Sequence, residues 1–243
     1  GLDTLSVLFS ITFDIDKKHG TAYHERYLAF LKKAQVRNLI VGAGMTDPKG
    51  DRSKRPSDQS DPDLFMHVTR RTDKGLYVKG AKAHMTGGLN SHWICVMPTM
   101  NMLESDKDYA VIGMIPATAP GLTYIYGRQS CDTRALEVGD IDKGNAQYGG
   151  QETLVIFDDV FIPWAHVLMD GEYEFAQELV SRFTAYHRAS YVCKTGLGDV
   201  MIGAASSVAE MNGAETASHV RDKLVEMTHL NETIYSSGIA SSY

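Results

Sequence analysis

Apolar residues recur at the helical period in the first and last parts of the chain. Residues 5–13 are apolar, and the apolar side chains within 22–36 lie three or four positions apart, which predicts two helices before Val41. From residue 172 to the end the helical period returns, with Gly213 marking a break between two further helices. Helices are therefore predicted on both sides of a different middle segment.

The middle segment contains short runs rich in Val, Ile and Tyr, separated by turn residues. These runs predict strands at 65–69, 76–79, 92–98, 110–116, 122–126 and 153–161. Their spacing is typical of an antiparallel β sandwich or barrel. The sequence thus predicts an α+β fold in three parts: N-terminal helices over 1–44, a β domain over 45–168 and part of a C-terminal helical bundle over 169–243.

Composition excludes several classes of function. A chain of 243 residues with 43% hydrophobic content can bury a sizeable core. Its 24 Lys and Arg against 30 Asp and Glu give a net charge of −6, which does not favour nucleic acid or anionic lipid as a partner. We expect a cytoplasmic protein that does not enter a membrane, because no apolar run approaches the ~20 residues of a membrane span. We also expect truncation at both ends, since the chain begins without Met inside an apolar pattern and stops without an obvious helix cap.

Chemically capable side chains gather in the segment 187–194. His187 and Tyr191 are four positions apart and Lys194 follows three later, so an unbroken helix would place all three on one face. A single histidine on a helix is more often a packed residue than a catalytic one. The neighbouring Tyr191, Cys193 and Lys194 favour a chemical role here.

Three further segments have the residue types of a cofactor site, and each also has an ordinary explanation. The stretch 83–88 predicts a strand end and a permissive turn where Thr86 can approach a planar ligand, or else a plain β turn. The loop 45–52 offers backbone amides and two cations to a diphosphate, although basic loops are usually only solvated. Glu152 precedes an apolar strand, which suits proton transfer or the capping of a turn.

Longer motifs point to a family. Residues 75–88 together with 157–163 resemble the middle β domain of the acyl-CoA dehydrogenase-like flavoproteins. Residues 45–52, 126–134, 149–152 and 187–191 are similar to the family of 4-hydroxybutyryl-CoA dehydratases within that group. The resemblance extends over essentially the whole chain, so it carries more weight than a single short motif.

The resemblance implies a role for each candidate residue. It places Thr86 at the flavin with His84 and Met85 alongside, and it assigns further FAD contacts to Met45, Thr46, Lys49, Asp51 and Arg52. It makes His187 and Cys193 ligands of a [4Fe–4S] cluster, and it puts Tyr191 and Lys194 beside the substrate. The candidate catalytic residues are therefore His187, Glu152, Tyr191 and Lys194.

Two departures from the family's pattern concern the cluster. His187 and Cys193 are separated by five residues, one fewer than in the family, so an ideal α-helix would place them about 120° apart. Either the helix is broken here or one residue is missing. A cubane also needs four ligands, and Cys95 in a β run and Cys131 in a loop do not match the family's other two cysteines. Truncation and a cluster-free enzyme both remain open, and we expect truncation.

The activity implied by the resemblance is radical dehydration of 4-hydroxybutyryl-CoA to crotonyl-CoA, with isomerisation of vinylacetyl-CoA as a second activity. The family implies an acyl-CoA substrate and a homotetramer with flavin sites between subunits. One alternative is a flavin-dependent aromatic hydroxylase of the 4-hydroxyphenylacetate 3-monooxygenase type, against which His187 and Cys193 argue. The other is an incomplete, non-catalytic chain.

Overall fold

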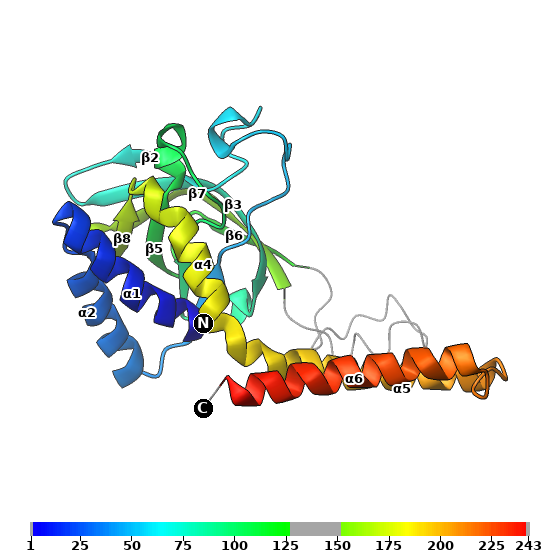
Figure 1. Ribbon diagram of the computed structural model, residues 1–243. Helices are drawn as coiled ribbons and strands as arrows, with labels where there is room; N and C mark the ends of the chain where they lie inside the picture. Colours follow the sequence, from blue (N-terminus) through cyan, green and yellow to red (C-terminus); the bar gives the residue numbers. More distant parts are fainter. Residues whose placement is uncertain (1, 127–151, 242–243) are drawn as a thin grey trace. The chain divides into compact units, whose positions relative to one another are not determined.

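The computed structural model describes residues 2–126 and 152–241, which fall into two compact units, residues 1–183 and 184–243 (Figure 1). The α-helices are α1 (Leu2–His19), α2 (Tyr23–Val36), α4 (Ala176–Tyr186), α5 (Tyr191–Met211) and α6 (Ser218–Ala240). Short 3₁₀ helices are η1 (Pro56–Asp58), η2 (Gly88–Asn90), η3 (Glu104–Tyr109), η4 (Trp164–His166), η5 (Tyr173–Phe175) and η6 (His187–Ser190). The expected domain boundaries at 44/45 and 168/169 stay predictions.

In the described part of the first unit, eight strands form two four-stranded sheets. Sheet A has the order β1 (Val41–Gly44), β4 (Trp93–Val96), β5 (Val111–Pro116) and β8 (Val167–Asp170). Sheet B has the order β2 (His67–Arg71), β3 (Gly75–Thr86), β7 (Glu152–Pro163) and β6 (Leu122–Tyr126). The six predicted strands are confirmed, and the short strands β1 and β8 were not predicted.

One strand pair differs from the expected antiparallel arrangement. Strands β1 and β4 run parallel, with Val41 opposite Trp93 and Gly44 opposite Val96. After β1 the chain passes through the 45–66 loop and two strands of sheet B before β4 returns to sheet A. A long crossover permits a parallel pair, whereas a tight hairpin requires an antiparallel one.

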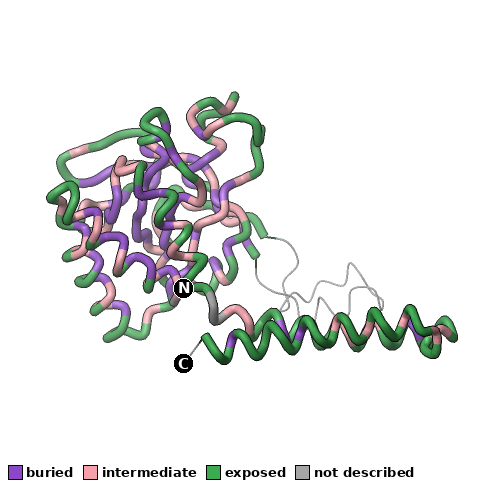
Figure 2. The backbone as a smooth tube through the Cα atoms, viewed as in Figure 1, coloured by how far each residue is buried: buried purple, intermediate pink, exposed green. Residues whose placement is uncertain are grey.

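The core lies between the sheets and beneath the N-terminal helices. All residues of β5 from Val111 to Ile115 are buried, because α1 and α2 pack on the side of sheet A that faces away from sheet B (Figures 1 and 2). In sheet B the burial alternates, and Leu76, Val78, Val160 and Ile162 point into the core. Helix α4 joins this unit through Leu179 and through an ion pair of 2.6 Å between Arg182 and Asp14.

The second unit is a hairpin of α5 and α6, and most of its surface is exposed (Figure 2). The break expected at Gly213 is confirmed: α5 ends at Met211, and Gly213 follows with φ of 63°, a conformation that favours glycine. Within residues 2–126 and 152–241, no helix is both long enough and apolar enough to cross a membrane.

Candidate functional site

A β-bulge in β3 sets the direction of the side chains at the predicted flavin turn. Lys82 pairs with Val155 and Met85 with Thr153, so β3 carries one more residue than β7 across this interval. His84 lies in the bulge with φ of 50°, an uncommon conformation for a residue with a side chain. The extra residue reverses the alternation, which buries Met85 and leaves Thr86 exposed.

Thr86 and Glu152, two of the predicted site residues, lie directly opposite each other on β3 and β7. The Thr86 hydroxyl donates a hydrogen bond of 2.5 Å to Oε1 of Glu152. Both side chains are exposed, so the carboxylate stands at the surface of the sheet end instead of inside the core. The structure thus places a hydroxyl and a carboxylate together where the two central strands of sheet B end.

Met85 is the buried residue that precedes Thr86 at the end of β3. Its side chain is fully buried, and its carbonyl accepts a hydrogen bond of 3.1 Å from Thr153. A Cβ atom on Gly44 would lie 2.8 Å from the Met85 methyl group, so β1 and the Met85 side chain pack closely against each other. The Met85 side chain therefore packs β3 against sheet A, next to Thr86 on the same strand.

The loop after β1 forms a second part of the candidate site. A hollow of about 270 Å³ is lined by Thr46, Lys49, Asp51 and Arg52 of this loop. Phe65, Thr99 and Met100 also line it. Lys49 and Arg52 are exposed, and neither has a hydrogen bond or ion pair with another residue in the described part of the chain. Two cations that no described carboxylate pairs with, beside backbone amides, suit an anionic group such as a diphosphate.

Asp51 carries a negative charge in the same loop as Lys49 and Arg52, but its carboxylate already accepts hydrogen bonds within the loop. It accepts hydrogen bonds from the hydroxyl (2.6 Å) and amide (3.0 Å) of Ser53. These hydrogen bonds, with the charge of Lys54, hold the pKa of Asp51 below its usual range. The turn that carries Lys49 and Arg52 is therefore held by local bonds of Asp51.

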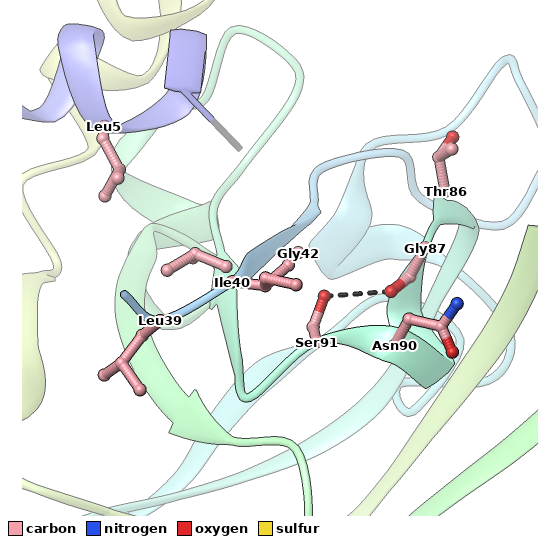
Figure 3. Close-up of a pocket in the computed structure, with 9 residues that line it drawn as sticks. Leu5, Leu39, Ile40, Gly42, Thr86, Gly87, Asn90 and Ser91 are labelled. Carbon is pink, nitrogen blue, oxygen red and sulfur yellow. Dashed lines mark hydrogen bonds between the residues drawn. The ribbon is translucent and has the colours of Figure 1, made fainter. Parts of the chain in front are cut away.

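A larger hollow of about 470 Å³ lies beside Thr86 (Figure 3). Leu5, Leu39 and Ile40 form one side, and Thr86, Gly87, Asn90 and Ser91 form the other (Figure 3). The Ser91 hydroxyl donates to the Gly87 carbonyl at 2.9 Å and so closes the turn. Sequence analysis missed this hollow, because its apolar side comes from α1 and from the two residues that precede β1, which are distant from Thr86 along the chain.

The segment 187–194 lies in the second unit and is not one continuous α-helix. His187–Ser190 form the 3₁₀ helix η6, and α5 begins at Tyr191. A broken helix was one of the two explanations for the shortened spacing. With ideal turns of about 120° and 100° per residue, the 3₁₀ start reduces the offset between His187 and Cys193 to about 60°.

The side chains of this segment differ in exposure. His187, Cys193 and Lys194 are exposed. Tyr191 is half-buried against α6, where its ring lies 6.1 Å from that of Tyr235 in an edge-to-face arrangement. Three of the four predicted residues therefore lie at the surface of the second unit, whereas Tyr191 also has a packing role.

The described residues do not provide a complete cubane site. No group of three or more His, Cys, Asp or Glu suitable for a metal occurs within 2–126 and 152–241. His187 and Cys193 supply two donors. Cys95 is buried in sheet A, where burial raises its pKa to about 12, so it is not disposed to ligate. Cys131 and the motif residues 127–134 and 149–151 lie outside the described residues.

The fold of two sheets with flanking helices agrees with what comparison with known proteins shows. The chain belongs to the 4-hydroxyphenylacetate 3-hydroxylase family: the N-terminal family profile matches residues 1–169 and the C-terminal profile matches residues 176–243. The predicted acyl-CoA dehydrogenase-like α+β fold is confirmed.

Within this family, the chain is similar to the 4-hydroxybutyryl-CoA dehydratases, which confirms the predicted resemblance. It is 56% identical over 244 aligned positions to "4-hydroxybutyryl-CoA dehydratase/vinylacetyl-CoA-Delta-isomerase" of Clostridium aminobutyricum, covering 100% of this chain and 50% of that protein. It is 64% identical to the solved oxygen-tolerant archaeal 4-hydroxybutyryl-CoA dehydratase from N. maritimus, with a TM-score of 0.85, covering 100% of this chain and 48% of that one.

A more distant structure supports the fold alone. The oxygenase component of 4-hydroxyphenylacetate 3-monooxygenase complexed with FAD is 24% identical, with a TM-score of 0.74, and the match covers 97% of this chain and 48% of that one. This chain spans about half the length of the relatives that it matches. Activity, substrate and partners of the whole protein are therefore matters of proposal.

Proposed function

We propose that the protein containing this chain is a lyase that dehydrates 4-hydroxybutyryl-CoA to crotonyl-CoA, with vinylacetyl-CoA isomerisation as a second activity. The identity of 56% to an enzyme with that name supports the assignment. The observation that carries it in the structure is the hydrogen bond of 2.5 Å between Thr86 and Glu152, which puts a candidate flavin contact beside a candidate base. We place the protein in the cytoplasm as a homotetramer.

FAD is the proposed cofactor, and the residues on sheet B and the basic loop fit it. Thr86, with His84 and Met85, would contact the ring system, and Thr46, Lys49 and Arg52 would hold the diphosphate end. Met45 and Asp51 shape the loop between these groups. When bound, FAD supplies a reversible one-electron oxidation of the substrate enolate, which makes the hydrogen at C3 acidic.

In the proposed reaction, residues of this chain perform the proton transfers. Conversion to crotonyl-CoA removes a proton from C2, another from C3 and hydroxide from C4, and it returns one proton to C4, so water is the only net loss. Glu152, exposed at the sheet edge and oriented by Thr86, is the proposed base for one of the carbon-bound protons. His187 is the second candidate base, and Tyr191 and Lys194 are proposed to orient the thioester.

His187 and Cys193 are also the proposed ligands of a [4Fe–4S] cluster, with two further cysteines from outside this chain. Their exposure on η6 and the first turn of α5 supports this proposal. Because the described residues supply only half of a cubane's ligands, we assign no step of the reaction to the cluster.

The second candidate function is hydroxylation of a phenol, which the family profile favours. A 4-hydroxyphenylacetate 3-monooxygenase oxygenase component of Thermus thermophilus is 28% identical, covering 84% of this chain and 42% of that protein. The lower identity places this function second. It requires reduced flavin and oxygen, whereas dehydration has no net oxidant.

The test compares both reactions in the anaerobically purified holoenzyme. We expect crotonyl-CoA from 4-hydroxybutyryl-CoA by chromatography, and we expect Glu152→Gln to lower kcat by about 10²- to 10⁴-fold. Thr86→Val, which removes the hydroxyl but keeps the volume, should lower it less. An enzyme that forms no crotonyl-CoA but hydroxylates a phenol with reduced flavin and oxygen overturns the proposal.

A further inference from the structure

A lysine is buried in the middle of β3, at a position that the sequence motifs do not explain. The side chain of Lys82 is 2% exposed and that of its partner Asp47 is 7% exposed. The Lys82 ammonium donates three hydrogen bonds: to Oδ1 of Asp47 at 2.5 Å, to the Met97 carbonyl at 2.8 Å and to the Met45 carbonyl at 3.0 Å. All three of its donors are therefore used.

These bonds connect sheet B to two chain segments that leave sheet A side by side. Met45 and Asp47 follow β1, and Met97 follows β4, the neighbour of β1. The second carboxylate oxygen of Asp47 accepts a hydrogen bond of 2.8 Å from Thr99. The next residue of β3, Ala83, donates its amide to the Thr46 carbonyl at 2.7 Å. Lys82 lies on the strand that ends in Thr86, and its hydrogen bonds thus hold the start of the basic loop in place.

Stability alone is a weak reason to keep such a pair. Replacing a buried ion pair by apolar residues of similar size is often neutral or stabilising, because both charges lose their hydration. The sheets already share an extensive apolar core, and the pair adds fixed geometry specifically to the backbone carbonyls of Met45 and Met97, while the next residue, Ala83, holds that of Thr46. The loop beyond, from Lys49 to Lys54, is exposed and takes its direction from this base.

We propose that Lys82 and Asp47 are positioning residues that set the distance between the basic loop and Thr86. The inference rests on the proposed function, in which both regions contact one FAD. The pair would hold Thr46 on one side and the Thr86–Glu152 couple on the other in a single geometry. Its loss then affects cofactor binding and turnover while the fold remains.

The test removes both charges together, so that neither remains buried without a partner. In the holoenzyme, we expect the double variant Lys82→Met with Asp47→Leu to be at least as stable as the control variant Leu168→Ala, as measured by the midpoint of unfolding. We expect its dissociation constant for FAD, measured by fluorescence titration, to rise about tenfold, and kcat to fall about 10- to 100-fold with little change in KM. Leu168→Ala, a core change in β8, should lower stability and leave FAD affinity and kcat unchanged.

A second variant keeps the proposal falsifiable should the double variant fail to fold. Thr99→Val removes the hydrogen bond to Asp47 but keeps the side-chain volume at the wall of the hollow, and it should change FAD affinity and kcat in the same direction by a smaller factor. Wild-type FAD affinity and kcat in a folded double variant, or in Thr99→Val where the double variant does not fold, overturn the positioning role. A wild-type protein that binds no FAD would overturn the proposed function instead.

Discussion

The carboxylate of Asp106 shows how one residue fixes a loop next to the candidate site. It is fully buried, and its oxygens accept hydrogen bonds from Arg55 Nε (2.7 Å), the Ser57 hydroxyl (2.7 Å) and the Leu103 amide (3.0 Å). Burial by itself raises the pKa of Asp106, but these hydrogen bonds outweigh it and the pKa is lowered. Asp106 therefore stabilises the fold in its charged form.

Asp106→Asn should lower the free energy of unfolding by about 2–3 kcal/mol at pH 7, since bonds to a charged acceptor are lost. The folded-state pKa lies below the unfolded value of about 3.9, so the wild-type advantage is complete above about pH 4 and is lost as the pH falls through the folded pKa. Urea unfolding at pH 7 and at pH 3 measures both effects. Asp159→Asn breaks an exposed pair with Arg70 and should change stability by less than about 0.5 kcal/mol.

At the scale of elements, α5 and α6 approach each other through two glycines. A Cβ atom on Gly238 would lie 2.2 Å from the ring of Tyr191, and one on Gly198 would lie 2.1 Å from Asn231. Asn231 is buried and donates hydrogen bonds to Asp199 at 2.8 Å and to the Thr195 carbonyl at 3.2 Å. The hairpin is thus held by close helix contact and a small polar cluster.

We expect Gly238→Ala to destabilise the hairpin by about 1–3 kcal/mol, because the new methyl group displaces the Tyr191 ring. Gly203→Ala is the matched control: nothing lies within 4 Å of its added Cβ atom, so better helix propensity should stabilise α5 by about 0.5–1 kcal/mol. Thermal unfolding followed by circular dichroism compares the two. Equal effects of the two substitutions would contradict close packing at Gly238.

The elements also show how far sequence patterns reach. Runs of β-branched and aromatic residues predicted six of the strands, and the helical period of the apolar residues predicted the terminal helices, because both signals lie within the elements themselves. The bulge between Lys82 and Met85 leaves no mark in the hydrophobic pattern, since it depends on the partner strand β7. For the same reason, the motifs placed Met85 beside the flavin but did not show that its side chain is buried. They also did not reveal the ion pair of Lys82 with Asp47.

At the scale of the molecule, the two units differ in how they protect reactive side chains. The first unit has a continuous apolar core in which Cys95 is fully buried, and burial raises the pKa of this thiol to about 12. The second unit is a two-helix hairpin in which Cys193 is exposed. The chemistry of the two thiols should therefore report on different parts of the protein.

In metal-free protein, iodoacetamide at pH 8 should modify Cys193 under native conditions and Cys95 only when the first unit unfolds. Peptide mapping by mass spectrometry distinguishes these cysteines from Cys131. The labelling rate of Cys95 should rise with urea in step with unfolding, while that of Cys193 changes little. Rapid native labelling of Cys95 would contradict its burial in sheet A.

The sequence alone determined the order of helices and strands, the family resemblance and the residue types of the candidate site, because periodicity and motifs are local properties of the chain. Tertiary structure decided which of those residues meet. It paired Thr86 with Glu152 across β3 and β7, and it placed Lys82 under the loop that follows β1. These contacts depend on strand register and on the closeness of the two sheets, and both follow from how the whole core packs.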